Sequence, residues 1–287
     1  MTIFILSHNR VASCPTLSLL KKLNYKGVVK IVVDNEDPQL EAYRNKYSDQ
    51  LLVFNKESIL GIVDTAFRKS EVIKASDLYA RVFIDLYARQ YNIGDYMVLD
   101  DDIRNFKFRV PNGNSLPTYP IGDFNMLLSS LFEFMHNKNV YVLSFAHQGT
   151  YMGGIRSFDE SKIMEKRVAS NVWLLNSSKP FIWQTIFYVD FNSCLLNGQK
   201  GKLVFTIPFI STEMEKQGGQ AKSDKQLKDN GMGEAYQKTT QLQRCLYSII
   251  VSPSSCTVRE VKREGNWWVR LNKETQFPKI VSDKFKK

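Results

Sequence analysis

An α/β fold of the Rossmann type is expected, with a mostly parallel sheet in the first half of the chain. Short β-branched runs alternate with amphipathic helical patterns over the first hundred residues. Apolar residues make up 43% of the 287-residue chain, which is enough for a large core. Each of the first strand-like runs ends in polar residues, as expected where the carboxyl ends of parallel strands form a ligand site.

The first half reads as four strands and three helices. A β-branched run such as VVKIVVD is typical of a buried strand, and the leucine spacing over 16–24 is typical of an amphipathic helix. Proline near the start of the second helix and Ser76 before the third are start signals. The expected strands are 3–7, 28–34, 51–54 and 96–99, and the expected helices are 16–24, 38–47 and 76–91.

The second half is expected to be mixed. A Pro/Gly/Asn-rich loop over 110–122 follows the last strand of the first half, and the polar stretch 214–233 predicts a mobile loop. The remaining patterns predict helices at 124–135 and 236–250, and strands at 140–145, 171–175, 202–207 and 267–271.

The charge favours polyanionic partners. The formal net charge is +10 and the pI about 9.3, which suits DNA, RNA, a membrane face or a phosphorylated ligand. The alternative is a lysine-rich solvated surface. Four scattered cysteines without a CxxC pair, with only three histidines, exclude a zinc finger and predict reduced, buried thiols.

The sequence predicts a soluble, cytoplasmic protein. The N-terminal apolar run is too short for a signal peptide and lacks a basic region before it. No run approaches the ~18 apolar residues of a membrane span, so no membrane partner is expected.

Three adjacent aspartates follow the apolar run 96–99. On an extended backbone, Asp100 and Asp102 point the same way and Asp101 the other way. Two carboxylates on one side of a strand end suit Mg²⁺ or Mn²⁺, and the cation offsets their mutual repulsion. The alternative is a solvated acidic turn or a helix N-cap. The preceding strand and the α/β order favour the metal site.

The chain resembles GT-A glycosyltransferases, and more narrowly the phage TET-associated glycosyltransferases, which modify hydroxymethylated pyrimidines in DNA. The order of the matching segments carries the resemblance more than any one segment. The segments are IFILSHNR, Gly61-Ile62 before Arg68, MVLDDDI, SFAHQG leading to Gly153-Gly154, YVDFN at 188–192, and FPKIVSD.

The resemblance implies a metal-dependent enzyme with a UDP-sugar co-substrate, in which residues 1–109 bind the nucleotide sugar and residues 110–287 the acceptor. Asp100 and Asp102 are implied to hold the metal and the diphosphate. The remaining implied donor contacts come from the strand-end loops and from one basic residue near the phosphates. They are Ser7, Asn9 and Arg10 at the nucleoside, Asp34 and Glu36 near the base or ribose, Asp101, and Arg68, for which a surface-helix arginine is an equal alternative.

The candidate catalytic base is Asp190. An inverting transferase needs a carboxylate to take the acceptor proton, and flanking aromatic residues raise its pKa by desolvation. The alternatives are Glu213 and Glu215, or an Asp190 that only bonds backbone amides at a strand end. The chain departs from the family pattern at Val189, where the resemblance implies an acidic residue.

A second departure concerns the metal. Many GT-A enzymes use a histidine late in the chain as a metal ligand, and no histidine follows His147 here. Diphosphate and water are then left to complete the cation's ligands. The late segment instead contains Trp267 and Trp268, which are expected either to pack in the core or to stack on a base or sugar.

The implied acceptor is double-stranded, hydroxymethylated DNA, and basic residues crowd the last third of the chain. The alternatives are a GT-A enzyme with a protein, lipid or polysaccharide acceptor, a nucleotidyltransferase, and an inactive nucleic-acid-binding module. The sequence is compatible with glucose, arabinose or another sugar as the transferred group, and with hydroxymethylcytosine or hydroxymethyluracil as the acceptor base. It is also compatible with inversion or retention at the anomeric carbon and with any oligomeric state.

Overall fold

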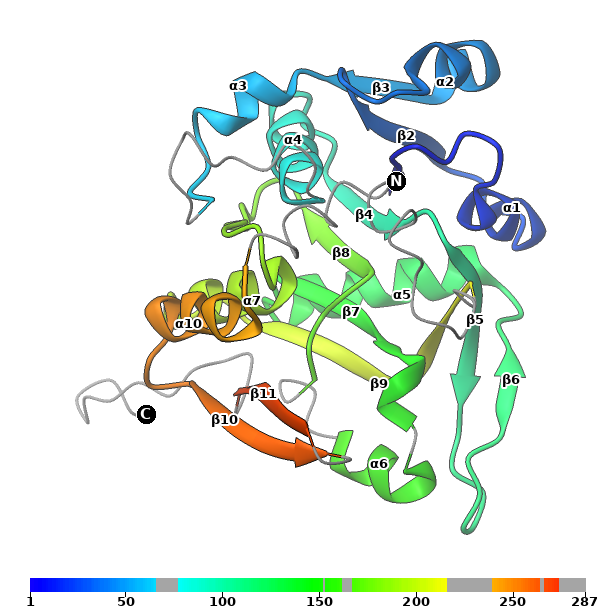
Figure 1. Ribbon diagram of the computed structural model, residues 1–287. Helices are drawn as coiled ribbons and strands as arrows, with labels where there is room; N and C mark the ends of the chain where they lie inside the picture. The colour runs from blue at the N-terminus through cyan, green and yellow to red at the C-terminus, as the bar shows by residue number, and fades with distance from the viewer. Residues whose placement is uncertain (66–76, 152, 162–166, 216–238, 264–265, 274–287) are drawn as a thin grey trace.

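The computed structural model describes residues 1–65, 77–151, 153–161, 167–215, 239–263 and 266–273 (Figure 1). A nine-stranded sheet runs through the protein in the order β3-β2-β1-β4-β8-β7-β9-β5-β6, and a separate two-stranded sheet pairs β10 with β11. The α/β prediction is therefore confirmed.

The first half builds a parallel sheet from strand–helix repeats. Strand β1 lies between β2 and β4, and all of these strands run in the same direction, as does β3 beside β2. The elements are β1 (Thr2–Leu6), α1 (Pro15–Lys22), β2 (Val28–Asp34), α2 (Leu40–Tyr47), a 3-10 turn η1 (Ser48–Gln50), β3 (Leu51–Phe54), α3 (Lys56–Leu60), α4 (Asp77–Gln90) and β4 (Asp95–Asp100).

The second half is mixed, as predicted. Strand β4 pairs antiparallel with β8, and β7 pairs antiparallel with β8 but parallel with β9. The elements are β5 (Ile103–Arg109), β6 (Thr118–Pro120), α5 (Phe124–Asn137), β7 (Val142–His147), the 3-10 turn η3 (Gln148–Tyr151), α6 (Gly154–Ser161), β8 (Val172–Asn176), α7 (Val189–Gln199), β9 (Val204–Met214), α10 (Gln241–Val251), β10 (Cys256–Arg263) and β11 (Asn266–Lys273).

Alternating side chains on the strands build a core on each face of the large sheet. Phe4 and Leu6 of β1 join the core that includes α4 residues Leu78 and Ile84. Ile3 and Ile5 join the opposite core with residues of α1 and α5. Because successive strand side chains point to opposite faces, the apolar run of β1 is buried on both sides.

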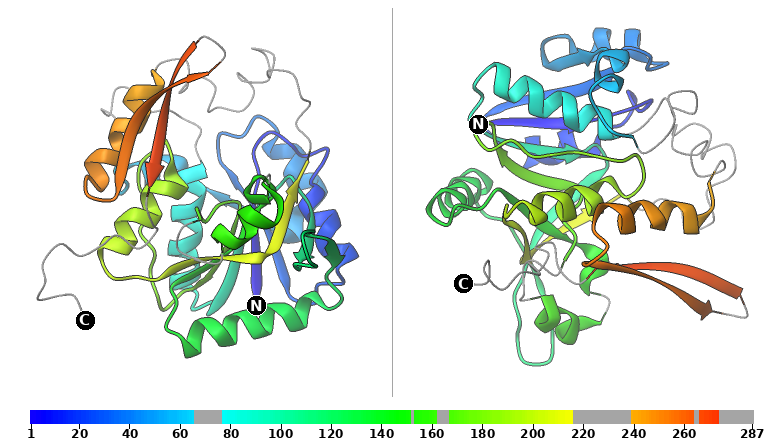
Figure 2. Two further views of the ribbon diagram at one scale, coloured as in Figure 1. Left: turned by 90° about the horizontal axis from the view of Figure 1, so that it is seen from below. Right: turned by 90° about the vertical axis from the view of Figure 1, so that its left-hand side faces the viewer.

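The last described elements are a helix and a hairpin that lie beside α7, outside the large sheet (Figure 2). Helix α10 begins with a capping box, in which the Thr240 side chain accepts from the Gln243 backbone and the Gln243 side chain accepts from the Thr240 backbone. The cysteines are free, as predicted, and Cys14 is half-buried while the other three are buried.

Most predicted elements agree with the structure to within a few residues, but the strand predicted at 202–207 continues to Met214 as β9. The alternative for Asp190, a place at a strand end, is wrong, because this residue lies in the first turn of α7. Ser76 and most of the predicted 214–233 loop lie outside the described residues. None of the described helices combines the length and apolarity that a membrane span requires.

Candidate active site

Strand register brings the predicted donor residues to one edge of the sheet. Leu6 of β1 lies opposite both Val32 of β2 and Asp100 of β4. The loops that follow these strands therefore leave the sheet side by side. One carries Ser7 to Arg10, the next begins at Asp34, and the third contains the aspartate turn. The sequence correctly anticipated this convergence from the parallel order of the strands.

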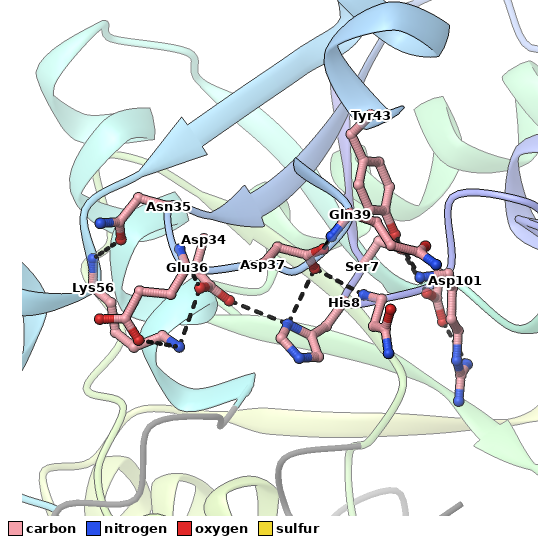
Figure 3. Close-up of polar contacts among 12 residues, drawn as sticks. Ser7, His8, Asp34, Asn35, Glu36, Asp37, Gln39, Tyr43, Lys56 and Asp101 are labelled. Atoms are coloured by element: carbon pink, nitrogen blue, oxygen red, sulfur yellow. Dashed lines mark hydrogen bonds and ion pairs between the residues drawn. The ribbon is translucent and has the colours of Figure 1, made fainter. Parts of the chain in front are cut away.

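His8 lies between two carboxylates at the ends of β1 and β2 (Figure 3). Its Nδ1 is 3.2 Å from an oxygen of Asp34 and 3.2 Å from an oxygen of Asp37. These hydrogen bonds raise the pKa of His8 to about 9, so the imidazole is charged at neutral pH. Lys56 is 3.1 Å from Asp34 and 3.5 Å from Glu36.

The two carboxylates of this cluster are held ionised. Burial acts to raise the pKa of Asp34 and Asp37, but the hydrogen bonds from His8 and other partners outweigh burial, and the pKa of each is lowered. The backbone N–H of Asn9 donates to Asp37 at 2.8 Å, and Asn9 has a left-handed φ of 52°. Each carboxylate of this cluster thus has cationic or N–H partners that balance its charge, and these contacts hold the loop after β1 in place.

Asp101 joins the first loop to the aspartate turn. Ser7 donates to one oxygen of Asp101 at 2.7 Å, and Arg10 donates to the other at 2.8 Å. Tyr43 is 2.7 Å from the Ser7 hydroxyl and accepts from the Arg10 backbone at 3.0 Å. Asp101 is only 6% exposed, and its two occupied oxygens give it a positioning role for Ser7 and Arg10.

Asp100 and Asp102 lie on either side of Asp101, in different surroundings. Asp100 ends β4, accepts from Asn171 at 2.5 Å and lies 3.5 Å from Arg81. Asp102 is in the turn, 9% exposed, and its charged neighbour is Arg10 at 3.6 Å. Because the strand ends at Asp100, the alternation of an extended backbone does not reach Asp102. Their pairing at a cation remains a prediction.

Arg81 is a buried residue that the sequence analysis missed. It is 2% exposed, and its guanidinium carbon lies 5.3 and 5.2 Å from the ring centres of Trp173 and Trp183, which pack edge to face against each other. Its Nη2 is 3.5 Å from Asp100 and 3.3 Å from Asp190. The signal was present, because Arg81 is one of two charged residues on the buried stripe of α4, the other being Asp85.

Asp77 adds a third carboxylate to this guanidinium. The Arg81 Nε donates to Asp77 at 3.0 Å, whereas Arg81 Nη1 is buried with no hydrogen-bond partner in the part of the chain that the structure describes. One arginine thus serves three acids, and Asp100 and Asp190 share a single nitrogen of it. Two predicted site residues from distant parts of the sequence are brought together in this way.

Asp190 lies in the first turn of α7, after Tyr188, whose φ of 52° is left-handed. Burial raises the pKa of Asp190 to about 6, although Arg81 acts to lower it. This is the direction expected from its aromatic neighbours Phe187 and Phe191, which are both buried. Burial, with the nearby charge of Asp190, also raises the pKa of Asp100 to about 7 against the lowering effect of Arg81.

The two rival bases are engaged elsewhere. Glu213 forms an ion pair with Lys107 at 2.8 Å between β9 and β5, and Glu215 forms an ion pair with Arg104. Both carboxylates are already matched by a cation on a neighbouring strand. Burial raises the pKa of Asp190, and its buried Oδ1 has no hydrogen-bond partner among the described residues, which favours it as a proton acceptor.

The acidic residues fit a divalent cation in chemistry and charge. Asp100, Asp101, Asp102 and Asp190 face two guanidinium groups, those of Arg10 and Arg81, so negative charge is in excess. The ion pair of Asp102 with Arg10 is long, at 3.6 Å. No group of three or more metal-type ligands occurs within the described ranges, so two carboxylates would leave further positions to diphosphate and water.

The predicted donor residues thus fall into two connected groups at one edge of the sheet. Ser7, Asn9, Arg10, Asp34 and Glu36 lie with Asp101 in the loops after β1, β2 and β4. Asp100 and Asp190 lie beside Arg81, and Asp102 lies nearest Arg10. Arg68 falls outside the described residues.

Residues 1–219 match the model of the TET-associated glycosyltransferase (TAGT) family. Among solved structures, the chain is similar to mannosyl-3-phosphoglycerate synthase from Rubrobacter xylanophilus, with 10% identity and a TM-score of 0.43 over 95% of this chain and 86% of that one. None of the curated proteins matches. Because the family model spans most of its length, the chain belongs to the TET-associated glycosyltransferase family and is a glycosyltransferase.

Proposed function

We propose that the enzyme transfers a sugar from a UDP-sugar to the hydroxymethyl group of a modified pyrimidine in double-stranded DNA, with Mn²⁺ or Mg²⁺ as its cofactor. The observation that carries the proposal is the meeting of Asp100 and Asp190 at Arg81, beside loops that converge from three parallel strands. Donor-binding and proton-accepting groups would then share one edge of the sheet.

The donor would lie along the loops after β1, β2 and β4. Asp100 and Asp102 would hold the cation, which supplies neutralisation of the charge that develops on the departing diphosphate. Arg10 is fixed by Asp101 at 2.8 Å and lies beside Asp102, so it is placed to contact the donor phosphates or nucleoside. The charged cluster of His8, Asp34 and Lys56 forms the adjoining wall, where the base or ribose would bind.

Asp190 would act on the acceptor. Its pKa of about 6 leaves it ionised at neutral pH and still basic enough to accept a proton. In an inverting reaction, Asp190 takes the proton of the hydroxymethyl group as that oxygen bonds to the anomeric carbon, and the bond from that carbon to the diphosphate breaks. The position of Asp190 at a helix N-terminus also favours its charged form once the proton has gone.

The acceptor is inferred from the family and from charge. A net charge of +10 favours a polyanion, and the family match supports a modified base as the acceptor. A 5-hydroxymethyl group projects into the major groove, where it is reachable without complete extrusion of the base. Arginine and lysine contacts to phosphates would supply affinity, and the modified base would supply the reactive hydroxyl.

The test is a panel of UDP-sugars with duplexes containing hydroxymethylcytosine, hydroxymethyluracil or neither, read by mass spectrometry of the released nucleosides. We expect a mass gain with one sugar, only on hydroxymethylated DNA, lost on chelation and restored by Mn²⁺ or Mg²⁺. Asp102→Asn should abolish the gain. Asp95→Asn, at the opposite end of β4, is the matched control and should retain it.

Three outcomes would contradict the proposal. Turnover that persists after chelation would show that the reaction does not need a metal ion. Sugar transfer to a protein, lipid or polysaccharide with none to DNA would replace the acceptor. Incorporation of a nucleotide from a nucleoside triphosphate, in place of a sugar, would make the chain a nucleotidyltransferase.

A further inference from the structure

The hairpin formed by β10 and β11 lies outside the part of the chain that the family model matches. That match ends at residue 219, whereas the hairpin spans Cys256–Arg263 and Asn266–Lys273. It is separate from the nine-stranded sheet and projects from the body of the protein beside α10 (Figure 2). An isolated two-stranded hairpin is only marginally stable, so a ribbon outside the main sheet suggests a functional role.

One part of the hairpin is anchored to the helix that carries Asp190. Buried Cys256 packs in a cluster with Phe191 and Leu195 of α7, and Leu271 of β11 packs against the same cluster. Phe191 directly follows Asp190, so the ribbon is tied to the start of the helix that bears the candidate base. Through this face the ribbon is therefore packed against the helix that carries Asp190.

The opposite face of the hairpin has a different composition. The antiparallel register places Arg259 opposite Arg270 and Val261 opposite Trp268, so these four side chains share one face. The two arginines are exposed, and Trp268 is 53% exposed. Glu260 lies opposite Val269 on the other face, and so does not neutralise the arginines.

The arginine pair is unfavourable without a partner. Like charges directly opposite each other in a sheet destabilise it, and neither arginine has an acidic partner in the described residues. An exposed tryptophan beside them leaves apolar surface in water. A polyanion with apolar or aromatic surface of its own removes both penalties, because it neutralises the guanidinium groups and covers the indole.

We infer that this face of the β10–β11 ribbon is a DNA-binding surface that enters the major groove next to the reacting base. The inference rests on the proposed function. The major groove of B-DNA admits a two-stranded ribbon, and the 5-substituent of a pyrimidine lies in that groove. Arg259 and Arg270 contact phosphates, while Trp268 packs on the sugar and base edges.

DNA suits this face better than a membrane surface does. A membrane-binding face gathers several apolar residues that insert together, whereas Trp268 is the only large apolar side chain described as exposed on the ribbon. Two opposed arginines match rows of phosphates on either side of a groove. Anionic vesicles therefore serve as the competing arm of the test.

The experiment measures binding of a hydroxymethylated duplex at several salt concentrations, with the full chain and its variants. Arg259→Ser combined with Arg270→Ser should reduce the slope of log K against log salt by about 2 and weaken binding at least about tenfold near 0.1 M salt. Trp268→Ala should weaken binding about five- to tenfold. In turnover assays, each change should raise the KM for DNA more than it changes kcat.

A charge reversal separates binding from stability. Arg259→Glu replaces a like-charge pair by an opposite-charge pair with Arg270, so the melting temperature should be unchanged or higher while DNA affinity falls. Trp268 fluorescence offers a direct readout, since the emission change on adding DNA should be reduced in Trp268→Phe. Lys21→Ser with Lys22→Ser, on α1 at the other side of the molecule, is the control of equal charge change (Figure 1).

The outcomes are distinguishable. The hairpin inference is overturned if the unaltered enzyme modifies DNA while the arginine and tryptophan variants bind and modify it equally well, or if the variants lose vesicle binding instead. It is also overturned if the α1 control loses as much affinity as the hairpin variants. If the unaltered enzyme neither binds nor modifies hydroxymethylated DNA, the proposed function fails as well.

Discussion

Two charged clusters lie at the same edge of the sheet, and they differ in how their charges are balanced. Around His8, the carboxylates of Asp34 and Asp37 meet an imidazolium and the ammonium of Lys56, and the pKa of each acid is lowered. Around Arg81, three acids share one guanidinium, and burial raises the pKa of Asp100 to about 7 and of Asp190 to about 6.

The difference in charge balance suggests that the two clusters have different roles. The matched cluster holds fixed charges in place and so suits recognition of a nucleoside that does not change during the reaction. The acid-rich cluster holds carboxylates that are ready to accept a proton or a cation, which suits the reacting end of the donor. The mutations below either break this contrast or make it sharper.

The largest expected effect is on turnover. Asp190→Asn keeps the size of the side chain but removes the proton acceptor, so kcat should fall about 10²- to 10⁴-fold with little change in donor affinity. Asp77→Asn is the matched control, since it also removes a carboxylate from Arg81 but leaves Asp190 in place. Equal losses in the two variants, measured by single-turnover transfer, would show that Asp190 acts only through the arginine.

The next effect is on folding. Arg81→Met leaves Asp77, Asp100 and Asp190 without their shared cation inside the protein, which should lower the free energy of unfolding by about 3–5 kcal/mol at neutral pH. Because the acids can then take up protons, the loss should be smaller near about pH 5. Denaturant unfolding at both pH values checks this, and an unchanged midpoint at neutral pH would contradict the assigned contacts.

The aspartate triplet offers a comparison between adjacent residues. Asp101→Asn disrupts buried contacts with Ser7 and Arg10 and should cost about 1–3 kcal/mol of stability. Asp102→Asn loses only an ion pair at 3.6 Å and should cost less than about 1 kcal/mol. Thermal unfolding without added metal measures both losses of stability. A larger loss in Asp102→Asn than in Asp101→Asn would assign the positioning role to Asp102 and the metal-binding role to Asp101.

The smallest effect is a pH dependence in the matched cluster. The pKa of His8 rises from 6.5 to about 9, so its contribution to stability is complete below 6.5 and is lost as pH rises through 9. Partial exposure of the ring limits the contribution to about 1–2 kcal/mol. His8→Gln should flatten the fall in stability between these pH values, and an equally steep fall would place the titrating group elsewhere.

The order of strands and helices and the edge that carries the site could be predicted from the sequence because periodicity and β-branched runs report local structure. The contacts of Arg81 could not, because they join α4, β4 and α7 from three distant stretches. The helix start before Asp190 was missed because FYVDFN has the aromatic and β-branched content of a strand, and only tertiary packing decides between the two. The different surroundings of Asp100 and Asp102 could not be predicted either, because local sequence does not show that the strand ends at Asp100 and a turn begins there.

The central claim is that a cation held by Asp100 and Asp102 links the donor diphosphate to the sheet. Calorimetric titration of UDP into the enzyme, with Mn²⁺ or with chelator, tests it directly. We predict that the metal strengthens UDP binding at least about tenfold, and that this gain disappears in Asp102→Asn but persists in Asp95→Asn. Equal UDP affinity with and without metal, or a full gain in Asp102→Asn, would contradict the claim.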